Sequence, residues 1–436
     1  MKRNIFLLFL FFLRISTGFA SIQIDKVYSN IIDSESVYIL TIEEAQDKAE
    51  SNYPAIAEYN IIESSKEFSI SNANKAYLPQ GTLIAQGTWQ SDVVEIPIDM
   101  PGLEIPSIDQ DQYRVVAELN QLIWDGGRVT AQKKSVEANA EIQKKQLDSE
   151  VYALKERVNN LFFGILLMKG RLNQQTILEK ELQRNYDNVQ VYVQNGLANN
   201  GDLNVVRVEQ IKANQQRVQI ESTLEAYIQM LSVLIGEQLS LNTEFVKPDN
   251  SDTIISPVIN RPELAMFEAQ ERAVETQKSL LNAKLRPTIG AFAQGGYGKP
   301  GLNMFDSEFT PYFIGGVRIS WNFGNLYTSK NDKKKLDLQK QSVNSKRETF
   351  LYNLNMVIPQ QLIEINKLNK TMQYDEEIIN LQTQIRKASE LKVENGTMTV
   401  SELMKDINAE EVAKQAKLLH EIQHLMSLYS LKYTTN

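Results

Sequence analysis

Four segments of the chain alternate apolar and polar residues with a period of two. They cover residues 80–92, 112–124, 287–298 and 311–323. In the second segment, one face carries Tyr113, Val115, Ala117 and Leu119, and the other carries Gln112, Arg114, Glu118 and Asn120. Such alternation over about ten residues is typical of barrel strands that are apolar outside and polar inside. A half-buried sheet in a soluble domain is the alternative interpretation.

Long stretches with helical periodicity follow each pair of predicted strands. Apolar residues spaced four and three apart run from Leu147 to Leu172, which is a coiled-coil heptad pattern. Pro359 should kink the second long helix, because it removes one backbone hydrogen bond. We expect helices over residues 54–76, 128–193, 262–284 and 329–393, and the long ones continue through Gly-containing turns into helical hairpins over 128–236 and 329–433.

The same landmarks occur twice in the same order, about 200 residues apart. The clearest pairs are Trp124 and Trp321, Asn195 and Asn395, and Gly196 and Gly396. We interpret this as an internal duplication, with a first repeat at 21–236 and a second at 260–436. Residues 237–259 are rich in Ser, Thr, Asn, Asp and Pro and form the expected linker.

One part of the first long helix should be covered by other segments. The run from Leu161 to Met168 is apolar around most of the helix and lies about halfway along it. Its outer side therefore needs apolar partners. We expect residues 21–40 and 237–259 to supply this cover, because they lie outside the repeated elements.

The composition excludes several kinds of chemistry. Cys is absent, so the chain has no disulfide, no cysteine-ligated metal and no cysteine-linked lipid anchor. Only two His residues occur, which argues against most acid–base and metal catalysis. The formal net charge is −8, so no basic surface of the kind that binds nucleic acid is expected. We predict no cofactor and no nucleic-acid partner.

Residues 1–20 have the layout of a secretory signal peptide. Lys2 and Arg3 precede an apolar run from Ile5 to Leu13, and Ala20 stands at the expected cleavage site. The run is too short to span a bilayer, and an uncleaved anchor is the alternative. After residue 20 no window is long and apolar enough for a transmembrane helix.

The predicted strands need partners from other chains if they enter a membrane. Four strands cannot close a barrel, because single-chain barrels have about eight strands or more. An open sheet edge has no hydrogen-bond partners in lipid. The barrel should therefore be shared, so that two copies would give eight strands and three would give twelve.

The order of these elements and three short motifs resemble the TolC-like outer-membrane efflux protein family. Residues 40–45, Leu-Thr-Ile-Glu-Glu-Ala, followed by Asn52 and Pro54, are similar to the family's opening helix motif. Two turns are similar to its helix tips, namely Gly196-Leu197 with Asp202 and Gly396-Thr397 with Glu402. The resemblance extends over essentially the whole chain after residue 20.

The resemblance implies a membrane α+β fold and a transport function. The implied assembly is a homotrimer with a twelve-stranded outer-membrane β-barrel, continued by a twelve-helix periplasmic coiled-coil α-barrel with an equatorial mixed domain. It would be a passive, non-enzymatic exit duct of a tripartite efflux or type I secretion system. Its implied partners are a periplasmic adaptor and an inner-membrane pump. It would reside in the cell outer membrane and extend into the periplasm.

The resemblance also places the closed end of the duct at residues 194–203 and 394–406. The family lines this constriction with acidic residues three apart, and the matching positions hold Glu402 and Lys405, with Asp406 adjacent. Three copies of Glu402 should then form a ring that attracts cations. The alternative is that Glu402 caps the start of its helix.

The family's ion-pair latch at the tip lacks one of its residues here. The family's tip Arg is matched by Met398, which cannot pair with Asp202. We therefore expect apolar contacts to close the tip instead, through Leu197, Met398 and Leu403.

Aromatic and basic residues near the strand ends predict the membrane interface. Trp124 and Trp321 stand at matching strand ends and favour an aromatic girdle. Basic residues follow each of them, namely Arg128, Lys133 and Lys134 in the first repeat and Lys330, Lys333, Lys334 and Lys335 in the second. We expect these to face phospholipid head groups, and a solvated helix face is the alternative.

Two further motifs suggest chemistry that the rest of the sequence does not support. His420 and His424 fit a zinc-protease pattern, H-E-x-x-H, but no third ligand follows, so we expect no metal site. Residues 295–301 are rich in Gly, but Pro300 replaces the expected Ser or Thr of a phosphate loop, which favours an outer loop. The alternatives to a duct are an exported soluble coiled-coil protein and, less well supported, a zinc metalloprotease.

Overall fold

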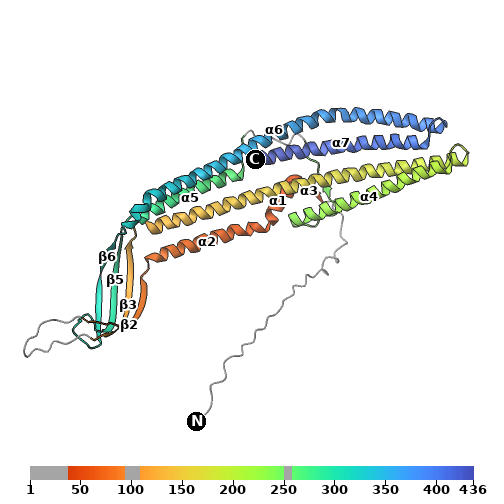
Figure 1. Ribbon diagram of the computed structural model, residues 1–436. Helices are drawn as coiled ribbons and strands as arrows, with labels where there is room; N and C mark the ends of the chain where they lie inside the picture. Colours follow the sequence, from red (N-terminus) through yellow and green to blue (C-terminus); the bar gives the residue numbers. More distant parts are fainter. Residues whose placement is uncertain (1–37, 94–108, 250–257) are drawn as a thin grey trace, which may run out of the picture. The chain divides into compact units, whose positions relative to one another are not determined.

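The computed structural model describes residues 38–93, 109–249 and 258–436. The expected signal peptide at 1–20 lies outside these residues. Residues Ile39–Asn436 form one compact unit. Within it, a helix, two strands, a long helix and a shorter helix follow one another twice along the chain (Figure 1).

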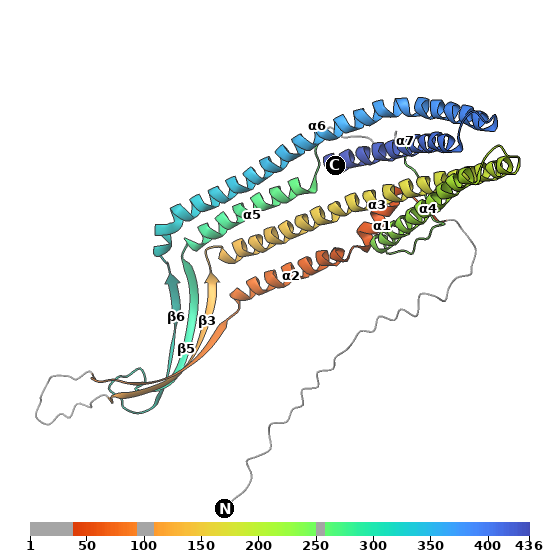
Figure 2. The same cartoon turned by 45° about the vertical axis from the view of Figure 1, so that its right-hand side comes forward.

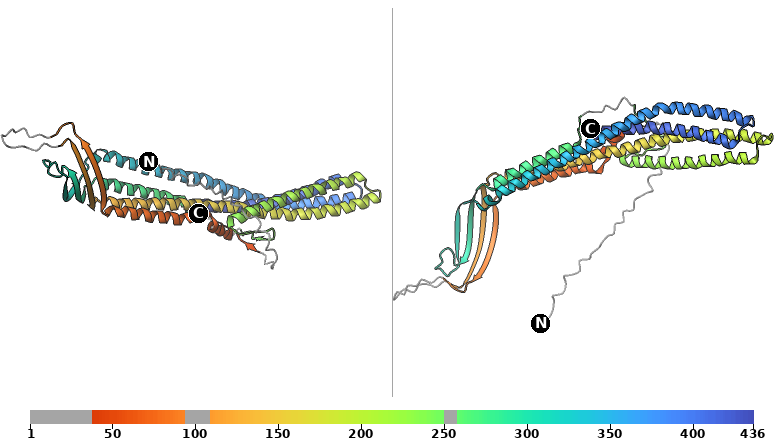
Figure 3. Two further views of the ribbon diagram at one scale, coloured as in Figure 1. Left: turned by 90° about the horizontal axis from the view of Figure 1, so that it is seen from below. Right: turned by 45° about the horizontal axis from the view of Figure 1, so that its top comes forward.

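The helices form two hairpins, with α3 packed against α4 and α6 packed against α7. Helix α5 packs against both α3 and α6, and α2 packs against α3 (Figure 3). None of the helices in the described residues has an apolar stretch long enough to cross a membrane. The helices are α1 (Ile42–Asn52), α2 (Ala57–Asn74), α3 (Arg128–Gln194), α4 (Asn200–Ile235), α5 (Pro262–Lys284), α6 (Gly324–Glu394) and α7 (Val400–Thr435).

Two of these helices differ from the sequence expectation. Helix α6 begins at Gly324, five residues before the expected start at residue 329. Pro359 lies inside α6 without ending it, so the lost hydrogen bond is tolerated within one continuous helix. The expected helix at 54–76 is divided into a short 3₁₀ turn at Pro54–Ile56, α2, and a second 3₁₀ turn at Lys75–Tyr77.

Four antiparallel strands form one sheet in the order β2-β3-β5-β6 (Figure 2). Strands β3 and β5 pair across the two halves of the chain. Two strands are shorter than predicted, because β2 ends at Trp89 and β6 ends at Ser320. The bounds are β2 (Gln80–Trp89), β3 (Asp111–Trp124), β5 (Thr288–Lys299) and β6 (Thr310–Ser320).

The register gives this sheet one apolar and one polar face. Leu83 lies opposite Ala117, and the large side chains on their face stay exposed, with Leu83 at 72% and Phe313 at 70%. On the other face, Arg114 Nε donates to Gln86 Oε1 at 3.0 Å. The alternation predicted from the sequence is therefore present in the paired strands.

The largest apolar core lies about halfway along α3. Phe162 and Phe163 are fully buried there. The rings of Phe162 and Phe245 meet edge to face with centroids 5.6 Å apart, and Phe163 meets Tyr429 at 5.3 Å. This core confirms that residues around the linker cover the apolar run of α3.

A small mixed layer completes this cover. Strand β1 (Ile39–Leu40) pairs in parallel with β4 (Glu244–Phe245), and Leu40 is fully buried in the same core. Helix α1 packs against α3 and α4 and buries Ile42 and Ala45, a contribution that the sequence did not predict. Residues 21–37 and 250–257 of the two segments expected to supply the cover lie outside the described residues.

A buried carboxylate joins the sheet to the long helix α3. Asp125 follows β3 and is 2% exposed. It accepts hydrogen bonds from the Gly127 amide at 2.8 Å and the Tyr77 hydroxyl at 2.9 Å. Gly126 has φ +71°, and a Cβ there would lie 2.7 Å from the Arg286 Cβ. The turn between strand and helix is therefore fixed by local chemistry.

Candidate functional site at the hairpin tips

The two hairpins end in turns of the same construction. Gly196 and Gly396 have φ values of +74° and +69°, a conformation that favours glycine. The next residue's amide in each turn donates to a carbonyl five positions back, Leu197 to Tyr192 at 2.8 Å and Thr397 to Lys392 at 2.9 Å. These glycine caps satisfy the last carbonyls of α3 and α6 and reverse the chain.

Both following helices begin with a capping box. The Asp202 carboxylate accepts from the Asn199 amide at 3.0 Å, and the Asn199 side chain accepts from the Asp202 amide at 3.2 Å. In the second tip, Glu402 Oε2 accepts from the Thr399 amide at 3.0 Å and from the Thr399 hydroxyl at 2.8 Å. The two acids predicted at the tip therefore serve as helix caps within the chain.

Glu402 keeps its charge in this position. The hydrogen bonds from the Thr399 amide and hydroxyl hold the pKa of Glu402 below its usual value. The two nearby charged residues differ in their contacts. Lys405 is exposed, whereas Asp406 accepts a hydrogen bond from the Ser389 hydroxyl at 2.6 Å and so connects α7 to α6. The side chain of Glu402 is exposed, so the capping contact leaves the carboxylate accessible to solvent.

An apolar group, here called the tip cluster, joins the two hairpins beside these turns. Leu403 belongs to the tip cluster and is 3% exposed, and Met398 packs against the cluster. Leu197, in contrast, is 65% exposed. Of the three apolar residues expected to close the tip, two therefore pack together within one chain. The buried members of the tip cluster are Leu178, Leu182, Val189, Val206, Ala213, Val393, Val400, Leu403, Met404 and Ile407.

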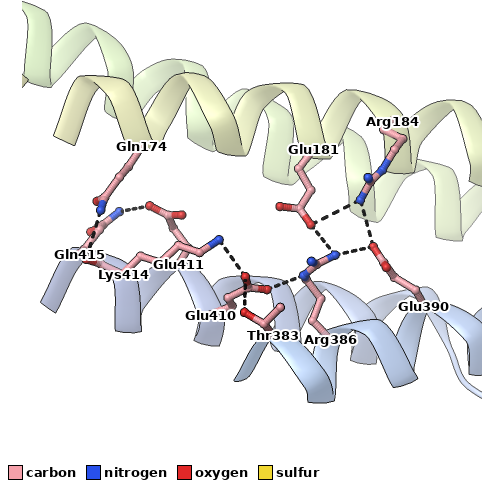
Figure 4. A network of polar contacts seen from close by, with 10 residues as sticks. All are labelled: Gln174, Glu181, Arg184, Thr383, Arg386, Glu390, Glu410, Glu411, Lys414 and Gln415. Carbon is pink, nitrogen blue, oxygen red and sulfur yellow. Dashed lines mark hydrogen bonds and ion pairs between the residues drawn. The ribbon is translucent and has the colours of Figure 1, made fainter. Parts of the chain in front are cut away.

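A polar network spans the hairpins further from the turns (Figure 4). Arg386 of α6 is its centre, and its Nη1 pairs with Glu181 Oε1 of α3 at 2.8 Å and with Glu390 Oε1 at 2.7 Å. Its Nε donates to Glu410 of α7. Arg184 adds a second bridge from α3, with Nη2 at 3.1 Å from Glu390 Oε1. Helices α3, α6 and α7 are thus connected by ion pairs that are partly buried.

The two adjacent acids of α7 have opposite electrostatic behaviour. Burial opposes ionisation of Glu410, but hydrogen bonds from Lys414, Thr383 and Arg386 outweigh it and lower the pKa of Glu410. Burial dominates at Glu411 and raises its pKa, and the hydrogen bond from Gln415 at 3.0 Å and the charge of Lys414 offset this only partly. The network therefore stabilises the negative charge of Glu410, whereas burial disfavours ionisation of the adjacent Glu411.

The sequence did not predict this network. Arg386 and Glu410 stand in heptad-like helices where charged side chains normally face water. Glu181, which pairs with Arg386, lies about 200 residues earlier in the sequence. The sequence contained one indication of the network, namely a charged residue at a position where the heptad spacing predicts an apolar residue. Such a signal indicates a buried pair without identifying its partner.

The residues predicted for the membrane interface gather where strands meet helices. Trp124 ends β3, and Trp321 directly follows β6, with its indole Nε1 donating to the Leu285 carbonyl at 3.0 Å. Arg128 is the first residue of α3, and Lys133 donates to Asn74 Oδ1 at 3.2 Å. The basic residues of α6, Lys330, Lys333, Lys334 and Lys335, are exposed and lie beyond its first turn, because the helix begins at Gly324.

The two other motifs have ordinary structural roles. His420 Nδ1 lies 2.8 Å from Asp375 Oδ2, and His424 is 5% exposed with a pKa lowered by burial. Within the described parts of the chain, no group of three His, Asp or Glu side chains is placed to hold a metal ion. Of the Gly-rich segment, residues 295–299 belong to strand β5, so no helix begins there to bind phosphate.

A family model for outer membrane efflux proteins matches residues 46–237. These residues include α2, β2, β3 and the complete first hairpin. No curated protein matches the sequence.

Solved structures of outer-membrane channels share the fold across nearly the whole chain. CusC, described with transmembrane channel formation, aligns with a TM-score of 0.65 at 13% identity, covering 91% of this chain and 92% of its own. VceC from Vibrio cholerae gives 0.63 at 10% identity, covering 90% and 94%. The CmeC outer membrane channel of Campylobacter jejuni gives 0.63 at 12% identity, covering 90% and 85%. The family match covers residues 46–237, and these solved structures show that most of the chain shares the fold of the outer membrane channels with which it aligns.

Proposed function

We propose that three copies of the chain form a passive exit duct through the outer membrane. The duct would receive substrates from an inner-membrane pump through a periplasmic adaptor. The observation that carries this proposal is the sheet β2-β3-β5-β6, with large exposed apolar side chains on one face and polar ones on the other. The first face suits lipid, and the second suits a water-filled lumen.

The edges of this sheet support a shared barrel. Among the described residues, neither β2 nor β6 has a partner strand on its outer side. Such edges leave backbone N–H and C=O groups unpaired, which lipid does not tolerate. Pairing β2 of one copy with β6 of the next removes every edge, and three copies then give twelve strands.

The periplasmic part follows from the continuity of strand and helix. Helices α3 and α6 begin directly beyond β3 and β6, so three copies of both hairpins would surround a tunnel below the barrel. Trp124 and Trp321 would then lie at the head-group level, with the basic residues of α3 and α6 next to the inner leaflet. The tips would close the tunnel and offer the docking surface for the adaptor.

Disulfide trapping tests the shared barrel directly, because the natural chain contains no Cys. Thr82→Cys on β2 would be combined in turn with Gly316→Cys, Arg318→Cys or Ser320→Cys on β6. All four positions lie on the polar face by register. We expect at least one combination to give covalent trimers after oxidation in membranes. Each single variant is the matched control and should give none.

The same preparations separate the duct from its alternative. The untreated protein should run as an oligomer on a gel when unheated and as a monomer after boiling, and it should conduct ions in planar bilayers. A soluble coiled-coil protein would remain dispersed without detergent and would show neither property. Monomers in all three register combinations, together with no conductance, would exclude the proposed duct.

A further inference from the structure

Three aromatic rings gather on the apolar face of the sheet, at the end away from the helices. The rings of Tyr297 and Phe309 stack with centroids 5.6 Å apart, and the ring of Tyr113 lies 6.4 Å from that of Phe309. We call Tyr113, Tyr297 and Phe309 the far aromatic cluster. Their side chains remain 48%, 53% and 45% exposed, so the described part of the chain leaves about half of each ring uncovered.

Two Trp side chains form a second aromatic row at the other end of the same face. Trp124 pairs in register with Ile289, so it shares the apolar face, and it is 42% exposed. Trp321 follows two residues after Ile319 on that face and is 49% exposed. Exposed aromatic rings therefore bound the apolar face at both ends.

The face between these two rows has no charged side chain among the paired strand residues. Its one polar residue there is Gln121, whose Nε2 donates to the Tyr77 carbonyl at 2.7 Å. Charges begin at the far aromatic cluster itself, where Lys299 lies opposite Tyr113 and pairs with Asp109 at 2.6 Å. An apolar band between two aromatic rows is the arrangement of strands that face lipid.

The length of strand between the rows gives the height of this band. Eleven residue steps separate Tyr113 from Trp124, which is about 37 Å along β3 at about 3.4 Å per residue. Barrel strands tilt by about 35–45°, which reduces this length to about 26–31 Å across a membrane. Ten steps from Pro311, the register partner of Tyr297, to Trp321 give about 24–28 Å in the same way.

We propose that the apolar face binds a lipid layer with a hydrocarbon thickness of about 25–30 Å, and that the far aromatic cluster lies at the head groups of its outer leaflet. The Tyr113 and Tyr297 rings then contact acyl chains while their hydroxyls reach the polar head groups. Trp124 and Trp321 take the matching position in the inner leaflet. This inference rests on the proposed function and adds a boundary and a thickness that a shared barrel does not fix by itself.

Quenching of Trp fluorescence by brominated lipids measures the depth of single positions. The three natural Trp residues, Trp89, Trp124 and Trp321, are first changed to Phe, and each variant then receives one substitution to Trp. Tyr297→Trp probes the far aromatic cluster, and Leu119→Trp probes the middle of the band. In vesicles, bromine near the head groups should quench Tyr297→Trp at least about twofold more strongly than bromine at the chain ends. The order should reverse for Leu119→Trp.

Lysine substitutions test the same boundary through assembly in vesicles. Leu119→Lys places a charge in the middle of the band and should lower the yield of heat-modifiable oligomer at least about tenfold. Tyr297→Lys should lower it by about fivefold or less, because the cost of a charge falls toward the interface. Thr82→Lys on the polar face is the matched control and should assemble normally. Equal losses for Leu119→Lys and Tyr297→Lys would overturn the boundary.

Vesicles of different chain length test the thickness. Assembly should be most efficient where the hydrocarbon layer is about 25–30 Å thick and should fall several-fold at about 40 Å. Equal efficiency at both thicknesses would overturn the proposed fit. If lipid quenches Leu119→Trp but chain-end bromine quenches Tyr297→Trp equally well, the boundary is wrong and the duct stands. If lipid quenches neither variant and no oligomer forms at any thickness, the duct is wrong as well.

Discussion

Single polar residues determine how the tips are built. Thr399 and Asn199 start their helices because a side-chain oxygen accepts from the first free amides, and the acid three positions later completes each box. The sequence placed Glu402 at the tip, but its capping contact depends on the conformation of Thr399. A local motif therefore located the residue, and only the backbone geometry assigned its role.

Glu402 allows its charge to be tested apart from its capping role. Glu402→Gln keeps a side-chain oxygen for the Thr399 contacts but removes the negative charge. We expect weaker cation selectivity and weaker block by divalent ions, measured from reversal potentials and single-channel currents. Asp202→Asn is the matched control in the other tip and should change closed-state conductance little. Unchanged selectivity in Glu402→Gln would contradict a charged ring.

Glu411 gives a pH dependence with a defined sign. Burial raises its pKa above the ordinary 4.5, so the folded state binds the proton more tightly than the unfolded state. The stability from this group is present below about pH 4.5 and is lost as the pH rises through the raised pKa. Glu411→Gln should therefore raise the free energy of unfolding at pH 7.5 and change it little at pH 4.

The neighbouring residue is the control for this prediction. The pKa of Glu410 is lowered in the folded protein, so its stability is present above the ordinary pKa and is lost as the pH falls through the lowered value. Glu410→Gln should decrease stability at pH 7.5, opposite to Glu411→Gln. Thermal melting at both pH values measures both variants. Effects of the same sign at pH 7.5 would contradict the assignment.

At the scale of elements, the polar network around Arg386 connects α3 to α6 and α7. Arg386→Met would leave Glu410, 4% exposed in its side chain, without its guanidinium partner. Leaving a buried charge unpaired costs about 3–5 kcal/mol, and the remaining pair with Lys414 at 2.8 Å places the cost here at about 3 kcal/mol. We expect a loss of this size in chemical denaturation. Arg217→Met, which breaks a half-exposed pair with Glu179, should cost about 1 kcal/mol or less.

Four exposed basic residues, Lys330, Lys333, Lys334 and Lys335, lie close together on α6, beyond its first turn. Anionic head groups would compensate for this arrangement. Changing Lys330, Lys333, Lys334 and Lys335 together to Glu should reduce the yield of assembled oligomer in membranes. The same four-fold reversal further along α6, at Lys346, Arg347, Lys367 and Lys370, is the control. Normal yield in the first variant would show a solvated face instead.

Strands and long helices were predictable because their periodicity is a local property of the sequence. Alternation identified the strands to within a few residues, and α5 begins at the Pro where the pattern placed it. The opening helix motif at residues 40–45 indicated helix α1, but its packing against α3 and α4 and the network around Arg386 were not predicted. Both depend on which helices become neighbours, and no local pattern encodes that choice.

At the scale of the whole molecule, the core around Phe162 and Phe163 connects segments from the beginning, the middle and the end of the described chain. Leu40, Phe245 and Tyr429 all contribute to it. Phe245→Ala should lower the free energy of unfolding by about 3–5 kcal/mol, because it leaves a cavity beside Phe162. Phe245→Leu should recover much of this loss. Equal effects of the two variants would contradict the cavity explanation, because Leu refills much of the lost volume.

The contacts in and beside this core join residues that are far apart in the sequence, which affects how the chain folds during synthesis. The Tyr429 hydroxyl donates to Glu43, 386 residues away, and the Tyr152 hydroxyl donates to the Tyr433 carbonyl, 281 residues away. Synthesis must therefore reach α7 before the surface of Phe163 can be covered. Contacts so distant form slowly, because the loop entropy is lost before any contact repays it. The emerging chain would expose an aromatic surface for a long time, and we expect holding chaperones to be needed until α7 arrives.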